Sequence, residues 1–315
     1  MRKTLFILLF LYIYSLADAT IFVYHRFGDD KHPSTNTSLT QLKNDFEYFR
    51  KNNYEVVPLS TLVKTIQDGK EVPTNWVVLT IDDAYKSFYT NGLEIFKEYG
   101  YPFSLFVYVK ATDEKYGDFM TWDMLKEVLP YGEVELHSYS HPRLTNLTIE
   151  QIKADTQKSY EIFEKKMGYK PKFYAYPYGE YNDDVKEAIK DSGFEAILNQ
   201  SSGATNKNSD LFDLFRVPLV GKVDIKEKLK YTAFDVEWIE PLEFPKDGIL
   251  KKVRAKVNKD VDKVKLFITG EKWIEEVDVV DGMVDIDLNI YLKNSRTRII
   301  IGTTYYNIAN KILIK

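Results

Sequence analysis

The sequence predicts an α/β domain built on a parallel sheet, followed by a smaller domain made only of β-strands. Between Thr20 and about Val223, short β-rich runs alternate with segments of helical periodicity. This alternation is typical of parallel sheets, whether open or closed into a barrel. From residue 224 the helical periodicity stops and only short alternating runs remain. A chain of 315 residues, 44% of them hydrophobic, is long enough for two cores of unequal size.

The strands of the first domain are predicted from short apolar runs rich in β-branched and aromatic residues. In chain order these runs are "IFVYH", "YEVVPL", "WVVLTID", "FSLFVYV", "EVEL", "KFYAYPY" and "EAILNQ". Helices are predicted where apolar residues recur at spacings of three and four, and several of these segments open on Ser, Thr or Asn and close at Gly. They are "SLTQLKNDFEYFRKNN", "STLVKTIQDG", "YTNGLEIFKEYG", "TWDMLKEVLP", "TIEQIKADTQKSYEIFEKKMG" and "NDDVKEAIKDSG".

The second domain, residues 224–315, is predicted to be an antiparallel β-sandwich. Its runs, among them "LKKVRAKVN", "KVKLFITG" and "TRIIIGTTYY", are separated by the turn sequences "PKDG", "NKDVD" and "VDG". We see no catalytic constellation in it. Trp238 and Trp273 have the chemistry to stack on sugar rings, but tryptophan in a small sandwich more often belongs to the core.

The first nineteen residues are predicted to be a secretory signal peptide. "MRK" supplies a positive start, "TLFILLFLYIYSL" a short apolar run and "ADA" a small-residue cleavage pattern ending at Ala19. The alternative is an uncleaved N-terminal anchor, and only then would a membrane be a partner. Either reading predicts a secreted or periplasmic domain.

Composition excludes several classes of protein. The net charge is −4 and there is no basic tract, so nucleic acid is not an expected partner. There is no cysteine, which excludes disulfide scaffolds, thiol catalysis and cysteine-bound zinc. A metal would have to be held by His, Asp or Glu, and the chain has only four histidines, His25, His32, His137 and His141.

Polar residues follow four of the predicted strands at the point where each strand ends. Asp82 and Asp83 follow "VVLTI", His137 follows "VEL", His25 follows "IFVY", and "YPYGEY" follows "KFYA". The carboxyl ends of parallel strands carry the sites of such folds. We therefore expect these groups to converge on one face of the domain.

The pair His137 and His141 is separated by three residues, and Pro142 makes a continuing helix unfavourable, so a loop is expected here. Together with an aspartate from a neighbouring strand end, the pair has the composition of a two-histidine, one-carboxylate metal site. A divalent ion held there would activate water and polarise a carbonyl. Taken separately, each motif also has a plain structural reading, because paired aspartates after a strand often cap a helix and a loop histidine is often a surface residue.

The segments "LTIDDAYKS" and "HSYSHP" resemble the first two motifs of the polysaccharide deacetylases, the NodB-homology or carbohydrate esterase family 4 proteins, and "YAYPYGEYN" is similar to the third. The resemblance covers about residues 20–223. It implies a (β/α)7 barrel-like fold. It also implies a divalent metal, most often Zn²⁺, with Co²⁺, Ni²⁺ or Fe²⁺ as alternatives.

The same resemblance implies roles for single residues. Asp82 would be the general base, and Asp83, His137 and His141 the metal ligands. The loop formed by Tyr176, Pro177, Tyr178 and Gly179 would be a wall of the substrate groove, with a backbone N–H that helps to hold the oxyanion. The reaction would be hydrolysis of an acetamido group on a sugar, with release of acetate.

Three departures from the family pattern bear on the site. Ala84 stands where the first motif has Gly, so we expect this turn not to need a positive φ. Ala175 stands where the third motif has an Arg that orients the base, and we hypothesise that Arg216 of "LFRVPLV", counted among the substrate-binding residues, supplies that charge from another strand. No histidine follows His141, although the family has a late one that acts as the general acid.

"IFVYHRFGDD" is similar to the opening of the subgroup that deacetylates poly-β-1,6-N-acetylglucosamine, in which the barrel is circularly permuted. That resemblance gives the acid role to His25, whereas His32 is expected to be a surface residue. The substrate expected is an exported polymer of this type, with polysaccharide export or synthesis machinery as a further partner. Peptidoglycan or chitin oligosaccharides are the alternative substrates, and a non-catalytic glycan-binding protein is the alternative function.

Overall fold

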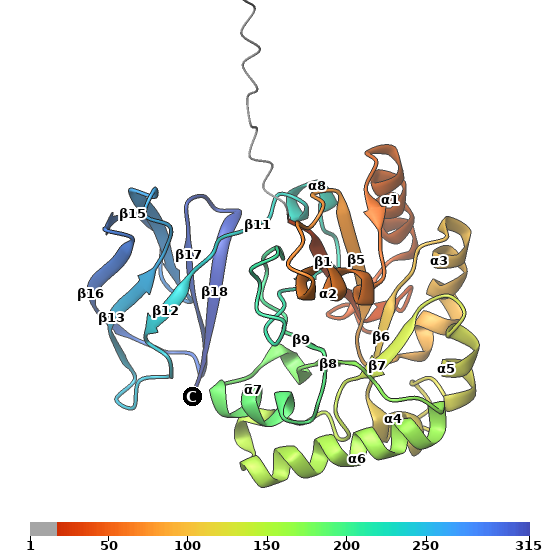
Figure 1. The fold of residues 1–315 in the computed structure, drawn as a ribbon. Coiled ribbons are helices and arrows are strands. Elements are labelled where there is room, and N and C mark those ends of the chain that lie inside the picture. The colour runs from red at the N-terminus through yellow and green to blue at the C-terminus, as the bar shows by residue number, and fades with distance from the viewer. Residues whose placement is uncertain (1–17) are drawn as a thin grey trace, which may run out of the picture.

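The computed structural model describes residues 18–315, which form an α/β barrel-like domain and an all-β domain side by side (Figure 1). Seven parallel strands follow one another in the barrel sheet in the order β10-β1-β5-β6-β7-β8-β9, and β4 pairs with β5 beside this path. Their bounds are β1 (Thr20–Tyr24), β4 (Glu55–Val56), β5 (Trp76–Ile81), β6 (Ser104–Val107), β7 (Glu133–Leu136), β8 (Phe173–Ala175), β9 (Ala196–Leu198) and β10 (Val217–Pro218). The predicted parallel sheet is confirmed.

The sheet curls so that its two ends approach each other. Leu198 of β9 bridges to Leu214, three residues before β10, and β10 pairs with β1 through Val217 and Phe22. The segment leading into β10 therefore connects the two ends of the sheet. The run "YEVVPL" contributes only the two-residue strand β4, and β10 is the seventh member of the path instead. Circular permutation of the barrel stays a prediction.

Helices cover the outside of the barrel where the sequence predicted them (Figure 1). Their bounds are α1 (Leu39–Lys51), α2 (Leu59–Gln67), the π-helix η1 (Phe88–Gly92), α3 (Leu93–Tyr99), α4 (Val109–Asp113), α5 (Trp122–Val128), α6 (Ile149–Met167), α7 (Asp183–Lys190) and α8 (Ile225–Lys228). Side chains at the starts of several helices accept hydrogen bonds from the first turn. Thr148 and Gln151 form a reciprocal capping box on α6, which ends at Gly168 with φ +83°. Three short elements complete the domain: β2 (Arg26–Phe27), β3 (Asn36–Thr37) and the 3₁₀ turn η2 (Leu144–Asn146).

Successive strand residues belong to two different apolar clusters, because they point to opposite faces of the sheet. On β5, Leu79 and Ile81 pack with the outer helices, whereas Val78 belongs to a second cluster that includes Leu62 of α2. Asp82 is four residues after Val78, and Asp83 is four residues after Leu79. β5 itself ends at Ile81, and the backbone turns at Asp83, where φ is +71°, so the two adjacent carboxylates leave the strand end in different directions.

The second domain is a single eight-stranded sheet in the order β11-β18-β17-β14-β15-β16-β13-β12. All its pairings are antiparallel except that of β11 with β18. Both halves of the sheet contribute to one core, so the prediction of an all-β domain is confirmed. The bounds are β11 (Thr232–Ala233), β12 (Glu237–Glu240), β13 (Ile249–Lys256), β14 (Lys263–Ile268), β15 (Ile274–Val280), β16 (Met283–Tyr291), β17 (Arg296–Gly302) and β18 (Asn307–Ile314).

The two tryptophans of this domain differ in environment. Trp238 packs against the core of the sheet. Trp273 instead contacts Phe267 and Tyr305, with ring centroids 5.2 Å apart in both pairs.

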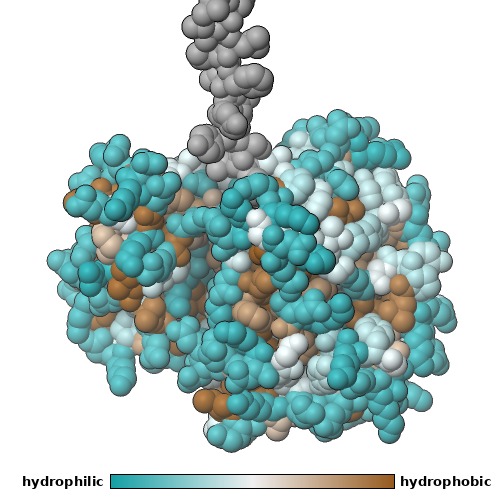
Figure 2. All heavy atoms as spheres, viewed as in Figure 1, coloured by the Kyte–Doolittle hydropathy of each residue, from teal (hydrophilic) through white to brown (hydrophobic). Residues whose placement is uncertain are grey.

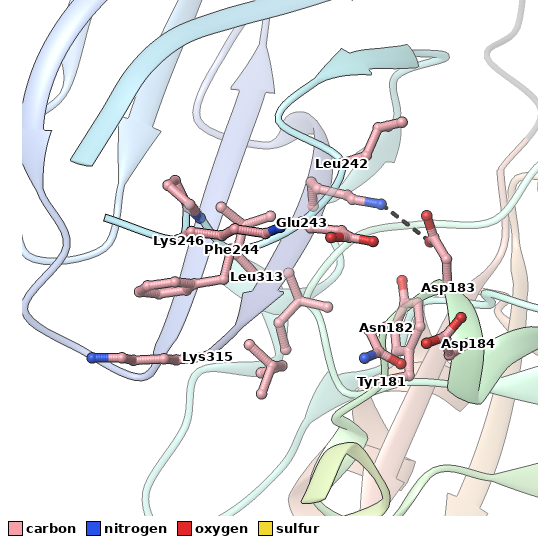
Figure 3. A pocket seen from close by; sticks show the side chains of 14 residues that line it. Tyr181, Asn182, Asp183, Asp184, Leu242, Glu243, Phe244, Lys246, Leu313 and Lys315 are labelled. Carbon is pink, nitrogen blue, oxygen red and sulfur yellow. Dashed lines mark ion pairs between the residues drawn. The ribbon is translucent and has the colours of Figure 1, made fainter. Parts of the chain in front are cut away.

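The two domains pack closely against each other. Ile312 of β18 belongs to the barrel core, and so does Ile225 of α8. The boundary at residue 224 stays a prediction. At the surface the junction is hollowed (Figure 2), and a pocket of about 280 Å³ lies where the start of α7 faces the end of β18. There Lys311 pairs with Asp183 at 3.5 Å (Figure 3).

Most of the predicted signal peptide lies outside the described residues, but its last two residues are part of the fold. Ala19 is fully buried and exchanges two backbone hydrogen bonds with Thr205, at 2.8 and 2.9 Å. Asp18 accepts a hydrogen bond from the Ala233 amide at 3.2 Å. A cut after Ala19 would remove these contacts. None of the helices in residues 18–315 combines the length and apolar composition that a membrane-spanning helix requires.

Candidate active site

The strand ends bring the predicted polar residues together at one edge of the barrel. The Asp82 amide donates to the Tyr24 carbonyl at 2.9 Å, which sets the end of β5 beside the end of β1 and so beside His25. The His137 amide donates to the Val107 carbonyl at 2.9 Å, which fixes the end of β7 next to β6. The expected convergence is present.

Asp83, His137 and His141 form a compact set of metal-ligand atoms. Asp83 Oδ1 lies 3.2 Å from His141 Nε2 and 3.5 Å from His137 Nε2, and the two Nε2 atoms are 3.2 Å apart. All three ligand atoms lie within 4.8 Å of one another. His137 Nδ1 is 2.7 Å from the Ala175 carbonyl, so Nδ1 carries the proton and the lone pair of Nε2 points toward the other two ligands. This donor set fits a divalent ion of the zinc type.

Burial keeps the two imidazoles in the form that can bind a metal. It lowers the pKa of His137 to about 3 and also lowers the pKa of His141, so both rings are neutral at physiological pH. Burial likewise raises the pKa of the Asp83 carboxyl to about 6, partly opposed by the charge of His25. A bound cation would favour the ionised carboxylate.

The loop that carries the two histidines is held by α6. Asp155 Oδ1 accepts from the Tyr139 amide at 2.8 Å, and Asp155 Oδ2 accepts from the Ser140 amide at 3.0 Å and from its hydroxyl at 2.6 Å. Within the loop, Ser138 Oγ accepts from the His141 amide at 2.9 Å. These bonds determine where His141 sits relative to His137.

Asp82 lies behind the metal ligands and pairs with Arg216. Both side chains are fully buried, and the guanidinium makes two hydrogen bonds to the carboxylate, at 2.7 and 2.8 Å. Gln200 Nε2 adds a third, 3.0 Å from Asp82 Oδ2, and that oxygen is 3.9 Å from His137 Nε2. Burial alone would raise the pKa of Asp82, but the charge of Arg216 holds it well below its usual value. The Asp82 carboxylate is therefore ionised at neutral pH.

Arg216 brings its charge to Asp82, as hypothesised, but its burial disagrees with its expected place among the substrate-binding residues. Its guanidinium has no exposed surface, so it contacts Asp82 and not a substrate. The Arg216 charge lies at Asp82, the carboxylate that the Arg of the third family motif would orient. This chain has Ala175 at the position of that Arg.

The turn after β5 corrects one expectation. Ala84 was expected not to need a positive φ, yet φ is +59° at Ala84 and +71° at Asp83. The left-handed region is unfavourable for alanine by about 1–2 kcal/mol. Ser138, His141 and Tyr178 also have positive φ, and a concentration of unusual backbone conformations is characteristic of functional sites.

The loop predicted as a groove wall divides into a buried and an exposed part. Tyr176 and Pro177 are buried, and Tyr176 stacks on Tyr181 with ring centroids 4.7 Å apart. Tyr178 is 38% exposed, and its ring lies 4.5 Å from the His141 ring. The 3₁₀ turn η3 (Pro177–Gly179) brings Gly179 so close to Gln200 that a Cβ would lie 2.5 Å from the Gln200 amide nitrogen. Only Tyr178 of this loop is therefore placed to touch a ligand with its side chain.

His25 lies close enough to influence the pKa of both Asp82 and Asp83, and its Nδ1 is buried without a hydrogen-bond partner in the described residues. A buried ring nitrogen with no partner is available to a bound molecule. His32 is 47% exposed and bonds Asp29 at 2.9 Å, away from these carboxylates.

Sequence reasoning missed three residues at or beside the site. Gln200 follows β9, so the strand-end rule that found His25 and His137 applies to it as well. Asp155 lies within α6 and carried no comparable signal, because its role depends on how the helix packs against the loop. Glu180, buried beside Tyr178 and paired with Arg143, was likewise not singled out.

Residues 69–197 match the profile of the polysaccharide deacetylase family. The chain is 27% identical over 242 residues to poly-beta-1,6-N-acetyl-D-glucosamine N-deacetylase of Escherichia coli K12, and the aligned region covers 64% of this chain and 36% of that protein. It is 24% identical over 211 residues to the Staphylococcus aureus protein of the same name, which covers 62% of this chain and 72% of that protein. The chain therefore spans about a third of the first of these relatives and most of the second.

Solved structures agree with this assignment at the level of the fold. The Streptococcus pyogenes deacetylase PplD superposes with a TM-score of 0.63 at 17% identity, covering 68% of this chain and 97% of that one. IcaB from Ammonifex degensii gives a TM-score of 0.58 at 22% identity, covering 65% and 92%. The match over residues 69–197, which contain the paired aspartates and the two histidines, identifies a polysaccharide deacetylase domain in this chain, and members of that family are hydrolases of amide bonds.

Proposed function

We propose that the protein removes N-acetyl groups from an exported polysaccharide that contains N-acetylglucosamine, of the poly-β-1,6 type. The observation that carries the proposal is the pairing of a buried, Arg216-held carboxylate, Asp82, with the ligand set Asp83, His137 and His141. The E. coli and S. aureus relatives are named for this linkage, and their similarity supports the substrate class.

In the proposed reaction, a water oxygen adds to the acetamido carbonyl and the carbon–nitrogen bond then breaks. The products are acetate and a free amine on the sugar. A divalent ion, Zn²⁺ or one of Co²⁺, Ni²⁺ and Fe²⁺, would act as a Lewis acid at Asp83, His137 and His141. Asp82 is the general base that takes a proton from the attacking water, because it stays ionised and has an oxygen 3.9 Å from His137 Nε2.

His25 is proposed to be the general acid that protonates the leaving nitrogen. Its neighbourhood to both aspartates supports this role. The Tyr178 amide is the proposed oxyanion donor, since the amides of Gly179 and Glu180 already donate to the carbonyls of Tyr176 and Pro177.

Peptidoglycan is the second candidate substrate. The chain is 31% identical over 142 residues to peptidoglycan-N-acetylmuramic acid deacetylase PdaC of Bacillus subtilis, which covers 45% of this chain and 28% of that protein. Chitin oligosaccharides would use the same residues. A purely glycan-binding function is less well supported, because Asp82, Asp83, His137 and His141 are all present.

Secretion or a periplasmic location is also proposed, with polysaccharide export or synthesis machinery as a partner. The support is the N-terminal pattern of a short basic stretch and an apolar run. Because Asp18 and Ala19 are built into the fold, we propose that any cleavage precedes Asp18. Intact mass of the exported protein tests this, and a mature chain that starts at Thr20 would disprove it.

Acetate release from defined oligomers tests the catalytic proposal. The purified protein would be analysed for bound metal and incubated with β-1,6 and β-1,4 N-acetylglucosamine oligomers and with peptidoglycan fragments. We expect acetate from the β-1,6 oligomer, one metal ion per chain, and loss of both in Asp83→Ala. Acetate release from peptidoglycan fragments alone would favour the second candidate substrate. If metal-loaded protein binds glycan but releases acetate from none of these substrates, the binding function would be favoured.

A further inference from the structure

The second domain contacts the segment that adjoins the proposed base. Residues 199–202 follow β9 and touch Asp82 and Arg216 from one side. The Gln200 side chain donates to Asp82, the Asn199 carbonyl accepts from Arg216 Nε at 2.7 Å, and the Ser201 carbonyl accepts from the Arg216 amide at 3.1 Å. The position of this segment therefore determines the surroundings of the carboxylate.

Side chains of β17 and β18 hold the same segment from the other side. Arg298 Nη2 donates to the Gln200 carbonyl at 3.2 Å, and Arg298 Nε lies 3.4 Å from Ser201 Oγ. Asn310 Nδ2 donates to the Ser202 carbonyl at 2.6 Å. Residues 199–202 are thus clamped between the second domain and the Asp82–Arg216 pair.

The clamp also reaches the exposed turn of the site. Gly179 packs directly on the backbone of Gln200, so the turn that carries Tyr178 is in contact with residues 199–202. On the other side of this turn, Arg296 of β17 lies 3.4 Å from Glu180, which also pairs with Arg143. Two neighbouring arginines of one strand therefore hold the two loops that flank the site.

We propose that Arg298 is a positioning residue, and that through it the second domain fixes Gln200, and so Asp82, in the catalytic geometry. The hydrogen bonds of the Arg298 side chain in the described residues go to Gln200 and Ser201, and none goes to the ligand set. It acts on the reaction only through residues 199–202. The inference rests on the proposed deacetylase function.

The test compares Arg298→Gln with Arg254→Gln, a matched arginine of β13 that pairs with Asp285 within the second domain. We expect Arg298→Gln to lower kcat about 10- to 100-fold, the range for small displacements of catalytic groups, with KM and metal content unchanged. Arg298→Lys should restore part of kcat, and Arg254→Gln should leave it as in the wild type. Unchanged kcat in Arg298→Gln would overturn the proposal.

A double-mutant cycle separates positioning from general destabilisation. Gln200→Ala combined with Arg298→Gln should lose no more activity than the larger single effect, because both changes break the same connection. Hydrogen exchange of residues 199–202, faster in Arg298→Gln than in Arg254→Gln, gives a readout that needs no substrate. If the wild type releases no acetate but this difference in exchange is present, the proposed function fails and the clamp stands. Equal exchange of residues 199–202 in Arg298→Gln and Arg254→Gln would refute the clamp.

A separate observation concerns the outer face of the same sheet. Phe267, Trp273 and Tyr305 form an aromatic cluster that packs against none of the three apolar cores, and Tyr305 is 48% exposed. Phe267 pairs with Ile300, two residues from Arg298 on β17, so it lies on the same face of the sheet as that arginine. Lys265 and Glu275 border the cluster, and both contact Tyr305.

We infer that this aromatic cluster binds pyranose rings of the polymer that the catalytic site deacetylates. Aromatic rings present flat apolar faces to sugars, and the two charged neighbours offer hydrogen bonds to hydroxyl groups. The cluster lies on the same face of the sheet as Arg298, which contacts Gln200 beside Asp82. This shared face favours the same glycan chain as the occupant.

The probe is β-1,6-linked N-acetylglucosamine polymer, compared with a trimer of the same linkage. Trp273→Ala should weaken co-sedimentation with the polymer about 10-fold and raise KM for the polymer, with kcat and KM for the trimer unchanged. Tyr291→Ala, which removes another exposed aromatic ring (62%) of this domain, serves as the control. Equal polymer binding by wild type and Trp273→Ala would overturn the inference, and binding needs no catalysis to be measured.

Discussion

Arg216 and Asp82 form a two-bond ion pair in which neither side chain reaches solvent. Arg216 directly precedes β10 and Asp82 directly follows β5, so the pair connects the two strands that flank β1. Asp83, the next residue, turns toward the histidines instead. One carboxylate is therefore matched by a fixed protein cation, and the other is available to a metal.

Replacing Arg216 with Gln should leave a buried charge without its partner. We expect the free energy of unfolding to fall by about 3–5 kcal/mol, and acetate release to fall well below a tenth of the wild-type rate in the fraction that remains folded. Urea unfolding and the acetate assay check the two effects. Arg216→Lys, which keeps the charge but loses the two-bond geometry, should recover most of the stability and less of the activity; a fully active Arg216→Ala would remove Arg216 from the site.

Replacing His25 with Gln should abolish proton donation without disturbing the metal ligands. We expect kcat to fall by about 10²- to 10⁴-fold, with the metal content of the wild type. His32→Gln is the matched control, because His32 is an exposed histidine of the following loop. Turnover of His25→Gln within a few-fold of wild type would show that another group donates the proton.

Replacing Asp155 with Asn should loosen the histidine loop, because the amide group cannot accept all three of the bonds that Asp155 receives. We expect metal affinity to drop by about 10- to 100-fold, measured by competition with a chelator. Asp184→Asn, an exposed change on α7, should have no effect. Unchanged metal affinity in Asp155→Asn would mean that the histidine loop keeps its conformation without the bonds to Asp155.

Replacing Ala84 with Gly tests the strain in the turn after β5. The change relieves a left-handed alanine, worth about 1 kcal/mol, and removes a buried methyl group, worth about 0.8 kcal/mol, so the stability should hardly change. Ala188→Gly removes a similarly buried methyl group from the ordinary helix α7. It should destabilise by about 1–2 kcal/mol, and equal losses for both variants in urea unfolding would contradict the strain.

Asp45 of α1 should make stability depend on pH. Its carboxyl is buried, and burial raises its pKa to about 7, with Gln41 bonded to one oxygen and Asp224 nearby. The folded state binds this proton more tightly than the unfolded chain does. The contribution is therefore fully present below about pH 4 and is lost as the pH rises toward 7, by about 2–4 kcal/mol.

The measurement is urea unfolding of wild type and Asp45→Asn at pH 5 and pH 7.5. Relative to the variant, the wild type should lose stability between these two values. A parallel pH dependence in both proteins would show that Asp45 ionises normally in the fold.

The sequence was informative wherever a local pattern determines the structure. Apolar runs of strand length and helical spacing gave the order of the elements, and the rule that polar groups gather at strand ends located Asp82, Asp83, His25 and His137. The contacts that hold these groups were harder to foresee. Gln200 reaches Asp82 across 118 positions, and Arg298 reaches Gln200 across 98, from a different domain.

The expectation for Ala84 failed for a related reason. An alanine at a position where glycine is usual shows only that the conformation is tolerated, and the surrounding core can enforce it. Ala84 is fully buried, and its carbonyl accepts from the Met120 amide at 2.9 Å. Tertiary packing therefore overrides the preference that the residue type suggests.

The position of β10 next to β1 has a consequence for how the protein is made. Phe22 pairs with Val217, so the first strand lacks one neighbour until nearly two hundred further residues have been synthesised. Asp82 likewise has no cation to meet until Arg216 has left the ribosome. The barrel domain should therefore stay incompletely folded through most of translation, which is the state that the proposed export of the chain would require.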